Sequence, residues 1–122
     1  MSRNYRKELL TIPDYNDPQA LPFGKYHTDH MIHVNWDIKN GWQNPRLEPF
    51  RDLNLSPFSS GLHYGIQCYE GTKAYKNEKG EIRMFRPECN AFRLKKSSVR
   101  VTLPDFDGQE LLNLMEELVK LE

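Results

Sequence analysis

Residues 59–76 constrain this chain most, because glycines and tyrosines gather there between a turn signal and a strand-like run. Pro57 and two nearby serines predict a loop, and residues 69–76 carry the aromatic content typical of a strand. Gly65 and Gly71 lack a Cβ atom, so each allows a backbone or ligand to approach closely or adopts a positive φ. A loop that enters a strand in this way is a common place to bind a small ligand.

Length and charge limit the class of protein. With 122 residues the chain suits one domain, because domains most often run to about 100–150 residues. Lysine plus arginine and aspartate plus glutamate both total 17, so no net charge draws the chain to nucleic acid or to a membrane surface. No apolar run approaches the roughly 20 residues that span a bilayer. We therefore expect neither nucleic acid nor membrane among its partners.

Cysteine content and the amino terminus indicate the compartment. Cys68 and Cys89 are too few for a disulfide framework, and the first residues do not resemble a secretory signal segment. The early basic residues are interrupted by Glu8 and Asp14, which is unlike a transit peptide. We expect a cytoplasmic protein, with a mitochondrial location as the alternative.

The amino-terminal part of the chain predicts an irregular arm followed by two strands. Prolines and short polar residues in residues 1–20 favour an irregular arm over a regular element. Residues 28–36 form an apolar run of strand length, Asn40-Gly41 turns the chain, and residues 47–53 predict a weaker second strand.

The carboxyl-terminal part predicts a further hairpin. Residues 69–76 and 81–85 are separated by four residues that end in Gly80, which can supply the positive φ of a short connection. Taken with the first two strands, this hairpin predicts an α/β (α+β) fold for residues 21–122, with a mainly antiparallel sheet and flanking helices.

Two helices are expected after this hairpin. Pro87 suits the first turn of a helix that continues to Val101. Asp107 and Glu110 then have the spacing of a helix capping signature. Apolar residues recur after them at helical spacing, so the second helix must bury one face; they are Leu111, Leu112, Met115, Leu118 and Val119.

Histidines and basic residues are the first candidates for chemistry. The histidines at 27, 30 and 33 are spaced like a metal cluster, but they lack cysteine or carboxylate partners at a zinc-site spacing, so we predict no metal site. A metal-dependent hydrolase would need such a site. Arg93, Lys96 and Arg100 share one helical face, which is by default solvated. An arginine in such a face can nevertheless bind phosphate through its guanidinium fork.

Several separated motifs together resemble one enzyme family. They lie at residues 21–31, 59–76 and 83–104, in that order along the chain. In this combination the sequence resembles the amino-terminal part of the branched-chain amino-acid aminotransferases, which are pyridoxal-phosphate enzymes of fold type IV. The resemblance runs from about residue 21 to the end of the chain, and it implies a partial small domain without the large cofactor domain.

The resemblance implies roles for four residues. Asn90-Ala91-Phe92-Arg93 matches the family element whose arginine contacts the phosphate of pyridoxal phosphate, which implies that role for Arg93. Tyr64 and Tyr69 match aromatic positions that wall the pocket for the substrate's aliphatic side chain. His27 occupies a further wall position where the mammalian pattern has phenylalanine.

The resemblance also implies what lies elsewhere. Transamination needs a lysine that forms a Schiff base with the cofactor, and in the family this lysine lies beyond the part that matches here. We therefore expect no catalytic residue within these 122 residues and no activity from them alone. The complete enzyme would be a homodimer that exchanges the amino group between leucine, isoleucine or valine and 2-oxoglutarate.

Two alternatives stay open at this point. Another fold-type IV enzyme, such as a D-amino-acid aminotransferase or an aminodeoxychorismate lyase, would share much of the pattern. A non-catalytic module that keeps the fold for interaction or assembly would also lack the lysine.

Overall fold

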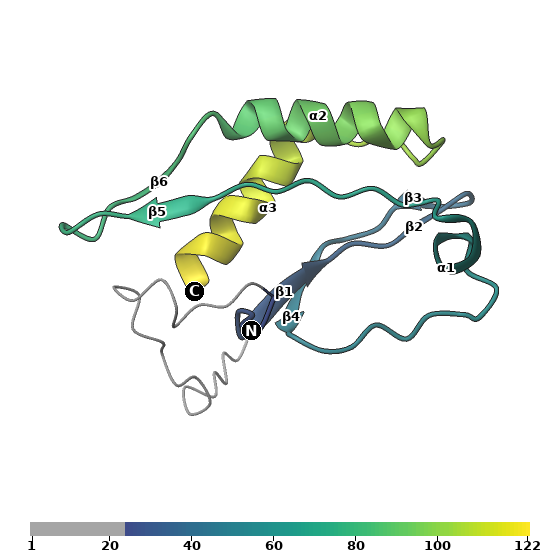
Figure 1. Ribbon diagram of the computed structural model, residues 1–122, viewed down its shortest axis with the longest axis horizontal. Coiled ribbons are helices and arrows are strands. Elements are labelled where there is room, and N and C mark those ends of the chain that lie inside the picture. The colour runs from purple at the N-terminus through teal and green to yellow at the C-terminus, as the bar shows by residue number, and fades with distance from the viewer. Residues whose placement is uncertain (1–23) are drawn as a thin grey trace.

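The computed structural model describes residues 24–122, so the predicted arm at residues 1–20 lies outside the described residues (Figure 1). In chain order the elements are β1 (His30–His33), β2 (Trp36–Asp37), β3 (Gly41–Trp42), β4 (Arg46–Pro49), α1 (Ser60–Tyr64), β5 (Ala74–Lys76), β6 (Ile82–Met84), α2 (Pro87–Arg100) and α3 (Gly108–Leu121). The fold is therefore mixed α/β, as the sequence predicts. Among the described helices, none is both long enough and apolar enough to cross a membrane.

The first four strands form one long antiparallel hairpin. β1 pairs with β4 at its base and β2 pairs with β3 near its tip, and the two ladders are joined where the Gln43 N–H donates to the Asn35 carbonyl at 2.8 Å. At the tip, the Asp37 carboxylate accepts from the backbone N–H groups of Lys39 and Asn40, each at 2.9 Å. Gly41 follows with a φ of +68°, which confirms the turn predicted at Asn40-Gly41.

The strands of this hairpin are shorter than predicted. The run at residues 28–36 is divided between β1 and β2, and the strand predicted at residues 47–53 ends at Pro49. The physical reason is the partner strand: β1 begins at His30, which lies opposite Pro49. One further backbone hydrogen bond follows, from the Phe50 N–H to the Asp29 carbonyl at 2.8 Å, and the ladder does not continue beyond it.

The second hairpin is confirmed, with shorter strands. β5 pairs with β6, and the connection closes where the Asn77 N–H donates to the Glu81 carbonyl at 2.9 Å. Gly80 has a φ of +80°, the conformation expected of it. All the described strand pairs are antiparallel, as predicted, but they form three separate two-stranded ladders instead of one continuous sheet. Strands of two to four residues present too few backbone groups to recruit a further neighbour.

Residues 59–76 contain a helix that the sequence did not predict. The short helix α1 occupies part of the predicted loop, and Gly65 ends it in the left-handed region at a φ of +63°. Gly71 does not have a positive φ, so the conformational freedom anticipated there is not used.

Both predicted long helices are confirmed. Pro87 lies in the first turn of α2. The Asp107 carboxylate caps α3 by accepting from the N–H groups of Gln109 at 2.7 Å and Glu110 at 3.1 Å. In Figure 1, α3 descends from beneath α2 toward the base of the long hairpin, where the Asp29 N–H donates to the Glu122 carboxylate at 3.0 Å.

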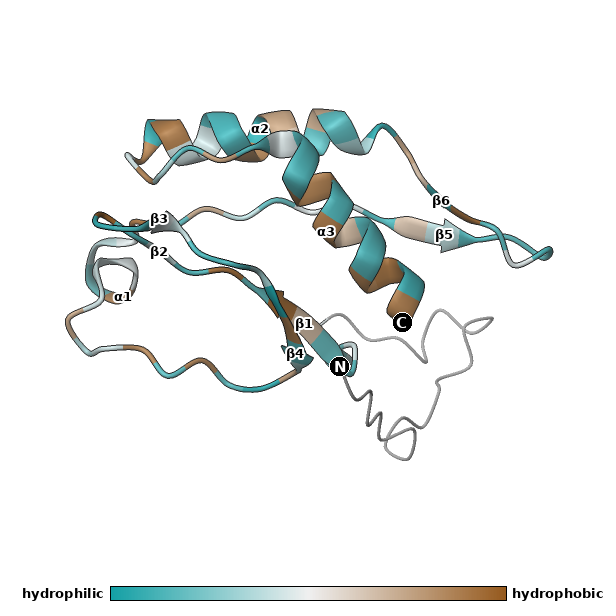
Figure 2. Ribbon diagram, turned by 180° about the vertical axis from the view of Figure 1, so that it is seen from behind, coloured by the Kyte–Doolittle hydropathy of each residue, from teal (hydrophilic) through white to brown (hydrophobic). Residues whose placement is uncertain are grey.

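The core lies between these two helices. The buried residues of the described part are Ala91 at 5%, Ser98 at 5% and Leu112 at 8% exposure. The helices lie close together at Gly108, where an added Cβ atom would lie 3.6 Å from that of Ala91, an ordinary van der Waals contact. Apolar residues recur along α3 (Figure 2), and those of the predicted stripe are buried or half-buried. The packing of α2 against α3 therefore fixes the orientation of α2.

Candidate functional site

The candidate site is the contact between α2 and the irregular segment of residues 65–73, which precedes β5. Arg93 projects from α2 toward this segment and holds Glu70 with two hydrogen bonds. Its Nε donates to Glu70 Oε2 at 2.9 Å, and its Nη2 donates to Glu70 Oε1 at 2.8 Å. This is a bidentate ion pair, the geometry in which a guanidinium binds a carboxylate most specifically.

Asn90 lies one turn before Arg93 and binds the same segment. Its Nδ2 donates to the Gly71 carbonyl at 2.7 Å and lies 3.4 Å from Glu70 Oε1. The Gly71 N–H also donates to Glu70 Oε1, at 2.9 Å. Residues spaced by three share one face of a helix, which explains why Asn90 and Arg93 reach one target. We call Glu70, Gly71, Asn90 and Arg93 the Glu70–Arg93 network.

The Glu70–Arg93 network shifts the pKa values of both ionised side chains in it. The hydrogen bonds from Arg93, helped by the Gly71 N–H and Asn90, lower the pKa of Glu70 to about 2 despite partial burial. The Glu70 carboxylate in turn raises the pKa of Arg93. The Glu70 side chain is 19% exposed and the Arg93 side chain 58%, so the carboxylate is enclosed while part of the guanidinium still faces solvent.

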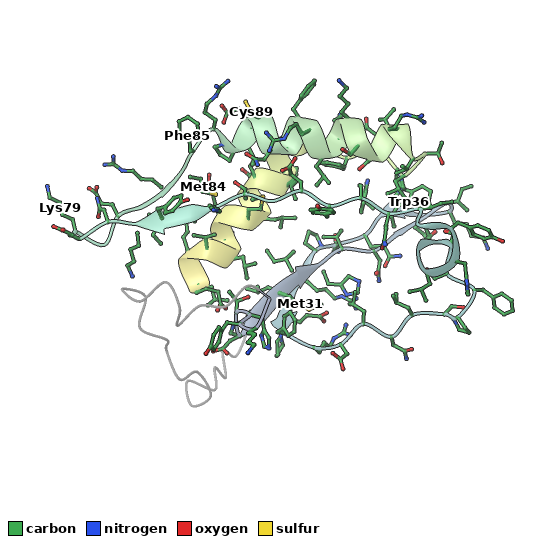
Figure 3. The ribbon with its side chains drawn as sticks, viewed as in Figure 1. Met31, Trp36, Lys79, Met84, Phe85 and Cys89 are labelled. Atoms are coloured by element: carbon green, nitrogen blue, oxygen red, sulfur yellow. The ribbon has the colours of Figure 1, made fainter. Side chains whose placement is uncertain are left out.

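A second contact ties the same segment to α2. Cys68 Sγ lies 3.4 Å from the hydroxyl of the buried Ser98, which donates to the Leu94 carbonyl at 3.0 Å. Cys89 lies in the first turn of α2 (Figure 3), and both thiols are free. Residues 68–71 are therefore held at two points on α2 without being part of a strand.

The rest of the basic face lies beside this contact. Lys96 and Arg100 line an open hollow of about 580 Å³ together with Cys68 and the last turn of α2. No ion pair of Lys96 or Arg100 is present within residues 24–122. The sequence prediction that these two belong to a solvated helix face therefore agrees with the structure.

The predicted aromatic residues are exposed. Tyr64, at the end of α1, is 82% exposed, and Tyr69, next to Glu70, is 93% exposed. His27 stacks on Phe50 with ring centroids 3.9 Å apart. Within the described residues, no hydrogen bond, ion pair or ring contact joins any two of His27, Tyr64, Tyr69 and Arg93. The structure thus fixes Arg93 in a network and leaves the three aromatic side chains separate from it.

The three spaced histidines have different surroundings. His30 Nδ1 lies 2.7 Å from Glu122 Oε1, and His33 Nδ1 lies 3.3 Å from Glu48 Oε1, while His27 stacks on a phenylalanine. Residues 24–122 contain no group of three or more histidine, cysteine or acidic side chains placed to hold a metal ion.

Comparison with known proteins shows which enzymes the chain is similar to. No protein-family model matches the chain. It is 43% identical over 129 residues to a mitochondrial branched-chain-amino-acid aminotransferase of Rattus norvegicus, an alignment that covers 100% of this chain and 33% of the rat protein. A mitochondrial enzyme of the same name from Mus musculus is 50% identical over 104 residues, covering 85% of this chain and 26% of the mouse protein. A Monosiga brevicollis branched-chain-amino-acid aminotransferase is 48% identical over 116 residues, covering 90% of this chain and 30% of the Monosiga protein.

The chain is homologous to part of the branched-chain-amino-acid aminotransferases. It spans no more than about a third of the length of these relatives, from 26% to 33%. The family resemblance derived from the sequence motifs is thereby confirmed.

Glu70 is the residue of this candidate site that the sequence did not reveal. The sequence motif of residues 59–76 contains Glu70 but assigns it no role, and Glu70 lies 23 residues from its partner Arg93. The one sequence signal for this ion pair is that the motif of residues 59–76 carries a carboxylate while the motif of residues 83–104 carries basic residues. That signal is weak, because the chain carries 17 acidic and 17 basic residues.

Proposed function

We propose that this chain forms part of a branched-chain-amino-acid aminotransferase. The complete enzyme would use pyridoxal phosphate and exchange the amino group between leucine, isoleucine or valine and 2-oxoglutarate. The observation that carries this proposal is the Glu70–Arg93 network, which joins the motif of residues 59–76 to the element Asn90-Ala91-Phe92-Arg93. The enzyme name shared by the relatives, which are 43% to 50% identical, supports it further. On this proposal the described residues belong to the small domain of a fold-type IV enzyme.

Arg93 suits the phosphate of this cofactor. Its two bonds to Glu70 occupy the Nε and Nη2 edge of the guanidinium, whereas an arginine has five N–H donors. The side chain is 58% exposed, so the remaining N–H groups are accessible to an anion. A planar fork of N–H donors matches two oxygens of a phosphate, which supports Arg93 as its anchor.

The other proposed roles concern the substrate. When bound, pyridoxal phosphate supplies the carbonyl and the electron-accepting ring on which amino-group transfer depends. Tyr64 and Tyr69 present exposed aromatic rings that would cover the branched aliphatic side chain and exclude water from it. His27 would add a third wall. The lysine that reacts with the cofactor is assigned to sequence beyond the part that matches here.

The remaining proposals concern partners and location. The small-molecule partners are amino acids and 2-oxo acids, and the complete enzyme is proposed to be a homodimer. Its relatives carry both cytosolic and mitochondrial names. We propose a cytoplasmic location, with the mitochondrion as the alternative.

The experiment compares Arg93→Ala with Lys96→Ala in the product of the complete reading frame. Arg93→Ala should raise the dissociation constant of pyridoxal phosphate about tenfold to hundredfold, because a hydrogen bond to a charged group is lost. Lys96→Ala is the matched control, since it removes one positive charge from the same helical face. Equal losses in the two variants would mean that the face acts as diffuse charge, and the assignment of Arg93 would be wrong.

A further inference from the structure

The two edges of the Arg93 guanidinium differ in their surroundings. The edge formed by Nε and Nη2 is paired with both carboxylate oxygens of Glu70, at 2.9 and 2.8 Å. Arg93 makes no other hydrogen bond within residues 24–122. The edge formed by Nη1 and the outer N–H of Nη2 has no hydrogen-bond partner in this part of the chain, and the Arg93 side chain as a whole is 58% exposed.

Glu70 is itself held in place. Its Oε1 accepts from the Gly71 N–H at 2.9 Å, and Asn90 Nδ2 lies 3.4 Å from the same oxygen. Two residues earlier, Cys68 contacts Ser98 on α2, which fixes the backbone that carries Glu70. At 19% exposure the carboxylate has little room to follow a moving arginine. Glu70 is therefore a fixed point against which Arg93 is oriented.

We propose that Glu70 is a positioning residue that holds Arg93 by one edge and so presents its other edge to a phosphate monoester. This inference rests on the proposed role of Arg93 as the anchor of the cofactor phosphate. Its physical basis is preorganisation: a long, flexible side chain that is already ordered loses less conformational entropy when it binds an anion.

Electrostatic repulsion alone predicts the opposite effect of Glu70 on phosphate binding. The direction in which the phosphate affinity changes when Glu70 is replaced therefore tests the proposal. Glu70 carries a negative charge at neutral pH, as any carboxylate of ordinary pKa does, and Arg93 and the Gly71 N–H lower its pKa further, to about 2. That charge repels a phosphate and partly neutralises Arg93. If Glu70 acted through charge alone, its removal would strengthen phosphate binding. If it positions Arg93, its removal weakens binding.

The test uses Glu70→Gln, which keeps the shape of the side chain and removes its charge. Glu88→Gln is the matched control, since Glu88 is an exposed carboxylate in the first turn of α2. Each apoprotein, made from the complete reading frame, is titrated with pyridoxal phosphate, and the dissociation constant is measured by absorbance at equilibrium. In parallel, NMR relaxation of the Arg93 Nε–H group in the 122-residue chain reports whether the guanidinium is ordered. Circular dichroism checks that each variant is folded.

We expect Glu70→Gln to raise the dissociation constant about tenfold and to disorder the Arg93 Nε–H group, with Glu88→Gln leaving both unchanged. If Glu70→Gln binds as tightly as the wild type or more tightly while Arg93→Ala binds weakly, the positioning role is wrong and the phosphate role of Arg93 stands. If Arg93→Ala also leaves binding unchanged, the proposed phosphate role itself fails. An Arg93 Nε–H group that is already disordered in the wild type overturns the positioning role without any variant.

Discussion

Leu112→Ala tests whether the contact between α2 and α3 is the core of the chain. Leu112 is the large side chain buried most deeply in the described part, at 8% exposure. It lies one helical turn after Gly108, which approaches Ala91 of α2, so the two share the face of α3 that is turned toward α2. Truncating a buried leucine costs about 2–5 kcal/mol. Its neighbours on α3 are only half-buried and can partly fill the space, so we expect the lower end, about 2–3 kcal/mol.

The assay is thermal and urea unfolding of the 122-residue chain, followed by circular dichroism. The expected loss corresponds to a fall of about 10 °C in the midpoint. Leu53→Ala is the matched control: it removes the same atoms from a side chain that is 55% exposed and lies in no element, so it should cost less than about 0.5 kcal/mol. Equal effects of the two substitutions, or a wild-type chain without a cooperative transition, would refute the argument that the helix pair is the core.

Three further outcomes follow from the local geometry of Glu70, Gly80 and Gly108. The pKa of Glu70 is lowered from 4.5 to about 2, so its ion pair contributes fully to stability above about pH 4.5, and this contribution is lost as the pH falls toward 2. Acid unfolding followed by circular dichroism should therefore depend less on pH across that window in Glu70→Gln, and an unchanged slope would contradict the ion pair. Gly80→Ala should lower the free energy of unfolding by about 1 kcal/mol, because φ is +80° there. Gly108→Ala should be neutral or stabilising, since the new Cβ would meet Ala91 at an ordinary 3.6 Å; losses of the same size at both glycines would contradict this.

Elements whose signals are local were predictable from the sequence. The turns at Gly41 and Gly80, the proline at the start of α2 and the Asp107 cap all depend on residues within a few positions of one another. The apolar stripe of α3 was equally clear, because a helix repeats its faces every few residues. The short helix α1 was missed, since five residues ended by a glycine resemble a loop in composition.

What the sequence alone determined about this protein is the order of its hairpins and helices, the presence of a basic face on α2 and the family it resembles. Tertiary structure decided that the strands form separate ladders and that Arg93, rather than Lys96 or Arg100, forms the ion pair with Glu70. The physical reason is distance along the chain. Local signals act between neighbours in sequence, whereas the choice of one ion pair among 17 acidic and 17 basic residues depends on which side chains the packing of α2 brings together.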